Sequence, residues 1–446
     1  MSYDVVVIGA GLAGLTAAIK ALEQGLKTIV ISRGASTLEV MSGCIDFYGG
    51  AVDPWPGIRD LARENPCHPY ALLEEEEIYQ ALSFFIQEVK SICPYHHQEG
   101  FQNYRLPTAL GQMRTRCLLP QGQVVAAGVN ERVLVVGFKG YRDFCSALMA
   151  EGMNKKGCSW RSIDVDLKLI QGLDNSPDCF YQNSASVRSY QNSIQLAVCL
   201  ERAWPLLAEE LRPQVQDVDK VAFPAVLGLD RYLELQQGLE ESLGKRVFEV
   251  PNLPPSLPGI RLSKCLMDRV RQLGGDLLQG SSVVAAEKTG DICSKVLVKT
   301  AGKKREIQGK CYIIATGRMS GKWIALQGEG VVAEKPGLLK GSLKEAGSSD
   351  QQCPRALAGA AEHSSTGIKV NKQLQPLDNE GKILLANVFC AGSVLAGYDP
   401  FSEGSGGGVA IATGYRAAVL AAKGVKGQKR QSNQQSQTGC TCSREG

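Results

Sequence analysis

The order of apolar and polar positions at the start of the chain predicts a strand, a turn, a helix and a second strand. Residues 4–8 read as a strand that is followed by Gly9, a helical pattern follows Gly14, and residues 27–31 again read as a strand. This succession is typical of a βαβ unit, in which a helix joins two parallel strands.

Later parts of the chain continue to alternate between helical and strand periodicity. Residues 74–89 begin with four glutamates and then carry apolar residues at helical spacing, so the acidic run is expected at a helix N-terminus. After the proline-rich segment 251–258, a helix is expected over residues 259–273. The strands expected after this helix span residues 277–279, 283–287, 296–299 and 309–315.

We therefore predict an α/β fold with a discontinuous Rossmann-like domain over residues 1–113 and 251–422. Residues 114–250 mix short strands with helical patterns and lack a dinucleotide motif. They are expected to form an inserted α+β domain that binds substrate or caps the first domain. Residues 423–446 are rich in Gln, Ser and Gly and are expected to form a flexible basic tail.

The composition supports a folded chain of more than one domain. Of 446 residues, 44% are hydrophobic and 21% charged, and the mean hydropathy is −0.10, which is far from the composition of disordered proteins. The net charge of +4 falls in the last 24 residues, which hold five Lys or Arg against one Glu, so the rest of the chain is neutral. No basic stripe marks a nucleic-acid-binding protein.

The 15 cysteines are scattered between Cys44 and Cys442 without a C-x-x-C pair. Scattered positions and an odd count do not indicate a disulfide framework. No metal centre is expected either, because iron–sulfur and zinc sites need closely spaced ligands. So many unpaired thiols fit a reducing cytoplasm. No run of 18 or more apolar residues occurs, and the apolar N-terminus lacks a basic leader. We therefore expect no transmembrane helix and only peripheral contact with a membrane.

The most direct sign of function is the pattern Gly9-x-Gly11-x-x-Gly14 between the first strand and the first helix. The first glycine permits a tight turn, the second lets a pyrophosphate approach the backbone, and the third lets the helix pack on the strand. The unpaired N–H groups at the helix start favour the phosphates. The pattern predicts binding of a dinucleotide or a flavin.

The acidic residue that usually ends the second strand of this motif and binds a ribose is missing. Ser32 and Arg33 stand in its place. Arg33 either binds a phosphate, of NADP or of a flavin, or is a surface residue without a ligand.

Two further strand ends carry small residues that let a cofactor approach the backbone. One run ends in Thr316 and Gly317, and the other ends in Gly392 and is followed by Ser393, where many FAD proteins have Asp. The alternative for each is an ordinary buried strand that ends in a glycine turn.

Gly406, Gly407 and Gly408 lie at the start of an apolar helix expected over residues 409–422. Glycine is a costly residue at a helix start, so we interpret this run as backbone on which a flat ligand lies. The helix N-terminus would then face the pyrimidine edge of a flavin and stabilise the negative charge of its reduced form.

These motifs run along nearly the whole chain except the tail. They are the glycine pattern at residues 9–14 and the segments 32–34, 42–46, 254–262, 315–317 and 399–408. With them the sequence resembles the B-subunit family of anaerobic glycerol-3-phosphate dehydrogenases, flavoproteins related to the flavoprotein subunits of fumarate reductase and succinate dehydrogenase.

The resemblance implies an oxidoreductase subunit that helps to convert sn-glycerol 3-phosphate to dihydroxyacetone phosphate. It implies FMN in this chain, with FAD as the alternative. It also implies a second subunit that contains FAD and an iron–sulfur, membrane-anchoring subunit that passes electrons to membrane quinone. The chain would be cytoplasmic and would reach the inner face of the cell membrane only through these partners.

Two other functions stay open. A stand-alone NADP-dependent reductase would use Arg33 but needs a second glycine fingerprint for nicotinamide, which the sequence lacks. A scaffold subunit that holds flavin without turnover is harder to separate from a dehydrogenase subunit.

No catalytic residue is assigned, because the four histidines, His68 among them, lie in polar or Pro- or Ser-rich contexts typical of loops or surfaces. Arg105, Arg261 and Arg318 are candidates for binding a substrate phosphate, with structural ion pairs as the alternative. The expected cofactor-binding residues are Gly9, Gly11, Gly14, Ser32, Arg33, Ser42, Gly43, Thr316, Gly317, Gly392, Ser393, Gly406, Gly407 and Gly408.

Overall fold

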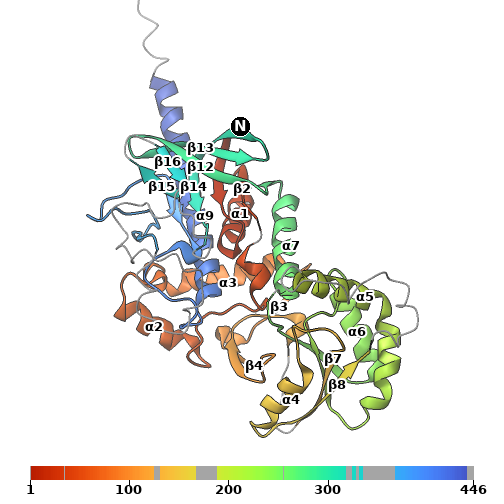
Figure 1. Cartoon of the computed structure of the whole chain (residues 1–446). Helices are drawn as coiled ribbons and strands as arrows, with labels where there is room; N and C mark the ends of the chain where they lie inside the picture. Colours follow the sequence, from red (N-terminus) through yellow and green to blue (C-terminus); the bar gives the residue numbers. More distant parts are fainter. Residues whose placement is uncertain are drawn as a thin grey trace, which may run out of the picture. The chain divides into compact units, whose positions relative to one another are not determined.

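The computed structural model describes residues 2–34, 36–124, 131–166, 188–254, 256–317, 324–327, 331–334 and 367–438. Many of its elements are labelled in Figure 1, and the chain divides into two compact units. The first unit comprises residues 1–35, 55–88 and 266–446, and the second comprises residues 36–54 and 89–265.

The first unit is built on a seven-stranded sheet. Its strands are β1 (Ser2–Ile8), β2 (Thr28–Ile31), β11 (Asp276–Leu278), β12 (Ser282–Thr289), β13 (Ile292–Thr300), β14 (Lys303–Ile314) and β17 (Val388–Cys390). They lie in the order β11–β2–β1–β14–β13–β12, and β17 pairs with β14. Strands β11, β2, β1, β14 and β17 are parallel, whereas β12 and β13 extend the sheet in antiparallel fashion. A separate antiparallel pair is formed by β15 (Ile324–Gln327) and β16 (Val331–Glu334).

Apolar strands and small-residue helices explain how this unit packs. Val5, Val6 and Val7 of β1 are fully buried, as expected for a parallel strand covered on both faces. The helices of this unit are α1 (Leu12–Glu23), α2 (Pro54–Glu64), α3 (Glu75–Val89) and α9 (Gly406–Thr438), and α7 (Leu257–Gln272) has residues in both units. Helices α1 and α9 pack closely at Gly414. A Cβ at this position would overlap the backbone of Ala13, so the lack of a side chain permits the contact.

The second unit contains a four-stranded sheet. Its strands are β7 (Arg132–Phe138), β8 (Ser159–Val165), β9 (Lys220–Pro224) and β10 (Arg246–Val250), and its helices are α4 (Ser146–Asn154), α5 (Arg188–Leu211) and α6 (Tyr232–Leu243). The strand order is β10–β9–β7–β8, and all pairs are parallel. Two short antiparallel pairs join β3 (Tyr95–His96) to β6 (Leu119–Pro120) and β4 (Tyr104–Pro107) to β5 (Met113–Arg116).

Short 3-10 helices complete the described elements. They are η1 (Thr37–Val40), η2 (Pro69–Leu72), η3 (Glu99–Phe101), η4 (Gln121–Gln123), η6 (Arg212–Gln214) and η7 (Gly392–Val394).

The α/β, Rossmann-like class is confirmed for the first unit, and the helices expected over residues 74–89 and 259–273 correspond to α3 and α7. Residues 114–250, which lie in the second unit, are expected from the sequence to be α+β. The main sheet of that unit is parallel, with helices between the strands, so this part is α/β instead. Periodicity along a strand does not reveal the direction of its neighbours, because side chains alternate in both kinds of sheet.

The bounds of the two units differ from those of the expected domains. A bridge between Ile45 and Leu118 and the pairing of β3 with β6 hold residues 36–54 and 89–113 within the second unit. Helix α9 continues to Thr438, so residues 423–438 of the expected flexible tail are helical. Lys, Arg and Gln in this stretch are good helix formers. Residues 439–446 lie outside the described residues.

Candidate functional site

Most residues predicted to bind the cofactor lie in the first unit, where its parallel strands end. Ile8 pairs with Ile31 on one side and with Ile314 on the other, and Ile314 pairs with Cys390. Because these are the last residues of β1, β2, β14 and β17, the residues that follow them meet at one edge of the sheet. The predicted residues at or beside this edge are Gly9, Gly11, Gly14, Ser32, Arg33, Thr316, Gly317, Gly392 and Ser393.

The turn between β1 and α1 has the geometry that its glycines predicted. Gly9 has a φ of +115°, and a Cβ there would overlap the carbonyl of Ala315. A Cβ on Gly14 would overlap the carbonyl oxygen of Gly9, so the third glycine lets α1 approach β1. At Gly11, by contrast, no atom of the described residues lies within 4 Å of the position of a Cβ. The turn therefore leaves open space beside Gly11.

The start of α1 suits an anionic group in this space. Gly11 is the N-cap residue, no side chain among the described residues caps the helix, and the first turn contains no acidic residue. A helix N-terminus carries unpaired N–H groups and a partial positive charge, and both favour a phosphate. The open space and the uncapped helix together fit the diphosphate of a flavin dinucleotide.

The ends of β14 and β17 are adjacent and are fixed by close packing. Gly317 and Gly392 have φ values of +76° and +77°. The N–H of Gly392 donates to Oγ1 of Thr413 in α9 at 2.8 Å, and a Cβ on Gly392 would lie 2.7 Å from the Cβ of Ala13 in α1. A Cβ on Gly317 would lie 3.7 Å from Oγ of Ser393. The end of β17 is thus held against both α1 and α9.

The turn before α9 is held by a side-chain acceptor. The N–H of Asp399 donates to Oε1 of Glu403 at 2.9 Å. Gly407 and Gly408 are buried, and Gly406 is half-buried. The glycine run therefore begins α9 from an ordered turn, and its contact with a flavin stays a prediction.

His68 lies in the loop that precedes η2, in line with the loop or surface position expected for the histidines, but its side chain is buried. It caps η2, is 1% exposed, and its Nδ1 accepts the N–H of Tyr70 at 3.0 Å. Its Nε2 lies 3.2 Å from Oε2 of Glu403. The two partners are 335 residues apart in the chain, so no local pattern in the sequence signals their contact.

The other histidine and arginine candidates gain no role from the structure. His96, His97 and Arg105 are exposed, and His363 and Arg318 lie outside the described residues.

Arg261 forms the structural ion pair that was the alternative to phosphate binding. It is 5% exposed, and its Nη1 and Nη2 donate to the two carboxylate oxygens of Glu249 at 2.6 and 2.9 Å. Its Nε donates to the carbonyl of Gly228 at 2.9 Å, and its guanidinium lies over the ring of Tyr232. These contacts leave the guanidinium engaged within the second unit.

Ser42 and Gly43, the two remaining predicted residues, belong to the second unit. Gly43 has a φ of +81°, and its carbonyl accepts the hydroxyl of Tyr95 at 2.5 Å. The adjacent Cys44 donates to Oε1 of Gln123 at 2.9 Å, and burial raises the pKa of its thiol to about 12. The segment is tightly packed around a protonated thiol, and its contact with a flavin stays a prediction.

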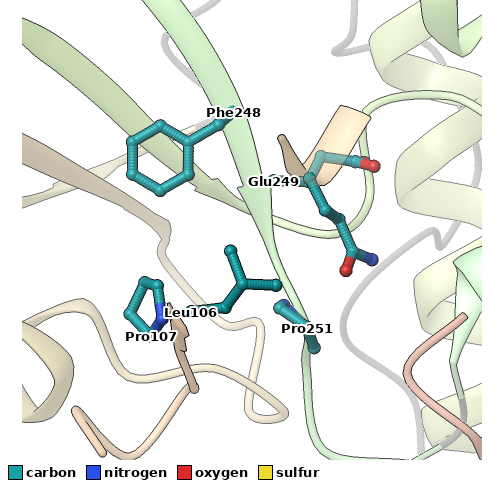
Figure 2. A pocket seen from close by; sticks show the side chains of 6 residues that line it. Leu106, Pro107, Phe248, Glu249 and Pro251 are labelled. Carbon is teal, nitrogen blue, oxygen red and sulfur yellow. The ribbon is translucent and has the colours of Figure 1, made fainter. Parts of the chain in front are cut away.

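The second unit also contains a small hollow with an empty volume of about 170 Å³, shown in Figure 2. Its lining residues are Leu106, Pro107, Gln123, Phe248, Glu249 and Pro251. The carboxylate of Glu249 is already engaged by Arg261 and by the N–H of Leu227. Part of this volume is open to solvent and the hollow has no room for even a water-sized sphere, so it is too small for a flavin.

Two kinds of feature are absent from the described part of the chain. Within it, no helix combines the length and apolarity that a membrane span requires. Nor do three or more His, Cys, Asp or Glu side chains gather there in a group that could hold a metal ion.

Comparison with known proteins decides the family. A family model described as "FAD binding domain" matches residues 4–409. The chain is 31% identical to the B subunit of the anaerobic glycerol-3-phosphate dehydrogenase of Vibrio vulnificus over 446 aligned residues, which cover 96% of this chain and 97% of that one. It is 30% identical to the B subunit of the same enzyme from Vibrio cholerae, with 94% and 96% covered. The chain belongs to the B-subunit family of anaerobic glycerol-3-phosphate dehydrogenases.

This B-subunit family also includes a probable member from Halobacterium salinarum, which is 31% identical to this chain with 95% and 98% covered. Among solved structures, an open flavocytochrome c3 fumarate reductase has a TM-score of 0.43 at 10% identity, with 95% of this chain and 78% of that one covered. The 3-ketosteroid delta1-dehydrogenase from Sterolibacterium denitrificans has a TM-score of 0.41 at 12% identity, with 95% and 99% covered.

As a member of the B-subunit family, the chain is a flavin-dependent oxidoreductase. The open space at Gly11 and the uncapped start of α1 fit such a cofactor. The expectation of FMN finds no support in the matched family model, whose description names FAD.

Proposed function

We propose that this chain is the flavin-binding B subunit of a complex that oxidises sn-glycerol 3-phosphate to dihydroxyacetone phosphate. The shared name of relatives that match over nearly their whole length supports this substrate. The oxidation removes a hydride from C2 and a proton from the C2 hydroxyl, so it needs a two-electron acceptor. A bound flavin supplies that acceptor.

The observation that carries flavin binding is the open space beside Gly11 at the uncapped start of α1. Gly9, Gly11 and Gly14 would hold the diphosphate there. The other residues proposed to line the cofactor are Ser32, Arg33, Thr316, Gly317, Gly392 and Ser393 at the strand ends, Gly406, Gly407 and Gly408 at the start of α9, and Ser42 and Gly43 of the second unit.

We propose FAD, rather than FMN, as the flavin. A turn of this glycine pattern at a helix N-terminus suits a diphosphate, whereas FMN carries a single phosphate. Acid release from the purified chain, followed by mass measurement of the released flavin, tests the proposal. FAD is the expected result, and FMN in stoichiometric amount would overturn it. A folded chain that takes up neither flavin would overturn the function itself.

We further propose that the chain works with two partners, a second subunit that contains FAD and an iron–sulfur subunit that anchors the complex at the inner face of the cell membrane. The naming of its relatives as B subunits supports a complex. The lone chain should show little reduction of a dye by glycerol 3-phosphate, and activity should appear on co-expression with the two partners. Robust turnover by the lone chain would contradict this dependence, and robust oxidation of NADPH would favour the stand-alone reductase.

A further inference from the structure

The contacts of His68 fix which of its nitrogens carries a proton. Nδ1 accepts the N–H of Tyr70 at 3.0 Å and therefore carries no proton of its own. The proton must lie on Nε2, which then donates to Oε2 of Glu403 at 3.2 Å. The ring is buried, and its centroid lies 5.2 Å from that of Tyr70 and 5.8 Å from that of Tyr398. The imidazole is thus a fixed hydrogen-bond donor to Glu403.

Glu403 receives three donors from the described residues. Besides His68, the hydroxyl of Ser405 donates to Oε2 at 2.7 Å and the N–H of Asp399 donates to Oε1 at 2.9 Å. Burial raises the pKa of the Glu403 carboxyl, but the hydrogen bonds from His68, Asp399 and Ser405 outweigh it and hold the pKa below its ordinary value. The side chain of Glu403 is 17% exposed, so this negative charge is only weakly screened by water.

The charge lies next to the start of α9. Glu403 precedes the first residue of the helix, Gly406, by three positions, and the first turn of α9 contains no acidic residue. The turn is anchored a second time, because Nδ2 of Asn65 donates to the carbonyl of Gly397 at 2.7 Å. The partial positive charge of the helix N-terminus is therefore opposed by a carboxylate of fixed position.

We propose that Glu403, oriented by His68, lowers the reduction potential of the flavin bound at the start of α9. The inference rests on the proposed function, since it requires the flavin to lie at this helix end. Two-electron reduction with uptake of one proton leaves a flavin with one more negative charge than its oxidised form. A neighbouring carboxylate disfavours that extra charge, so it favours the oxidised flavin and helps the reduced flavin to give up its electrons.

The decisive variant is Glu403→Gln in the full chain loaded with flavin. The midpoint potential is measured at pH 8 by reductive titration with dithionite against an indicator dye, and the affinity for oxidised flavin is measured alongside. We expect reduced flavin to gain about tenfold in affinity relative to oxidised flavin, which raises a two-electron potential by about 30 mV. Glu380→Gln is the matched control, because it removes one exposed carboxylate from the same unit and should leave the potential unchanged.

A second variant, His68→Asn, separates orientation from charge. Asn is a good N-cap, so it should still accept the N–H of Tyr70, but it removes the donor to Glu403. The carboxylate then keeps its charge with less compensation, and the potential should fall. Opposite shifts in the two variants are the result expected of this proposal and not of simple loosening of the turn.

Shifts of the same sign, or no shift in either variant, would overturn the proposal. If Glu403→Gln does not fold, His68→Asn decides alone, since an unchanged or raised potential there would refute the role of Glu403. These outcomes differ from failure of the proposed function, which would show as a wild-type chain that holds no flavin.

Discussion

Gly11 and Gly14 belong to one motif, yet the structure predicts that alanine at the two positions has different effects. Gly11 has φ −82° and ψ −177°, which alanine adopts without strain, and no atom of the described residues lies within 4 Å of its Cβ position. The folded chain without flavin should therefore tolerate Gly11→Ala, and could gain about 0.4–1 kcal/mol from a more restricted unfolded state. At Gly14, a Cβ would overlap the carbonyl oxygen of Gly9, so Gly14→Ala should cost about 1–3 kcal/mol of stability.

The effect on flavin follows from the same geometry. A methyl group on Gly11 would occupy the space proposed for the diphosphate and would displace at least one charge-assisted hydrogen bond, worth about 1.5–3 kcal/mol. The affinity of Gly11→Ala for flavin should thus fall by about 10- to 150-fold. Fluorescence titration of the flavin-free chain with FAD measures the affinity, and thermal unfolding followed by circular dichroism measures the stability.

Two results would refute this reasoning. If Gly11→Ala binds FAD as tightly as the wild type, the space beside Gly11 does not receive the cofactor. If Gly11→Ala is destabilised as much as Gly14→Ala, a general defect in the turn explains any loss of flavin. Loss of affinity without loss of stability at Gly11 is the outcome that only a ligand contact predicts.

Three further predictions concern other parts of the chain. Gly407→Val should abolish flavin binding and leave the circular dichroism spectrum largely intact, because a branched side chain would intrude at the buried start of α9. If the variant retains its flavin absorbance, the glycines at the start of α9 form a structural turn only. Arg261→Met should lower the free energy of unfolding, measured in urea, by about 3–5 kcal/mol, because it leaves the carboxylate of Glu249 buried without its charged partner. Arg246→Met, which removes the arginine of an exposed ion pair, should lower it by less than about 1 kcal/mol. Similar losses for both variants would count against the role of burial. Burial raises the pKa of the Cys44 thiol from 9.0 to about 12, so the unfolded chain loses this proton first and stability should decline as the pH rises from about 9 to about 12. Cys44→Ser should lessen that decline in unfolding experiments across this pH range, and equal pH slopes for the two proteins would contradict the prediction.

The parts of the fold that depend on local patterns were predictable from the sequence. The second strand was expected over residues 27–31 and is β2, Thr28–Ile31, because an apolar run after a glycine turn is a local signal. The acidic run at the start of α3 likewise marks its N-terminus. Gly9, Gly317 and Gly392 of the candidate site could be found for the same reason, since each follows an apolar strand.

Features that depend on distant contacts were not predictable. The hydrogen bond between His68 and Glu403 needs two loops that the fold brings together, and neither loop has a pattern that points to the other. The main sheet of the second unit is parallel because helices cross over between its strands β7, β8, β9 and β10. The alternation of side chains along a single strand does not indicate the direction of its neighbours. The carbonyls of Ser42 and Gly43 accept hydrogen bonds from the side chains of Gln123 and Tyr95, so this segment is well packed. Whether the two residues contact the cofactor stays a prediction.

The pairing of β1 has a consequence for how the protein is made. Val5 pairs on one side with Thr28, but on the other side with Cys311. At about 5–20 residues per second, the ribosome takes roughly 15–60 seconds to travel from the first partner to the second. During that interval the growing chain carries an apolar strand with one unpaired edge, and all four parallel strands of the second unit are synthesised before the interval ends. The strand-end edge itself is complete only after β17 and α9 have followed, so the proposed cofactor site forms only after these two elements have been made.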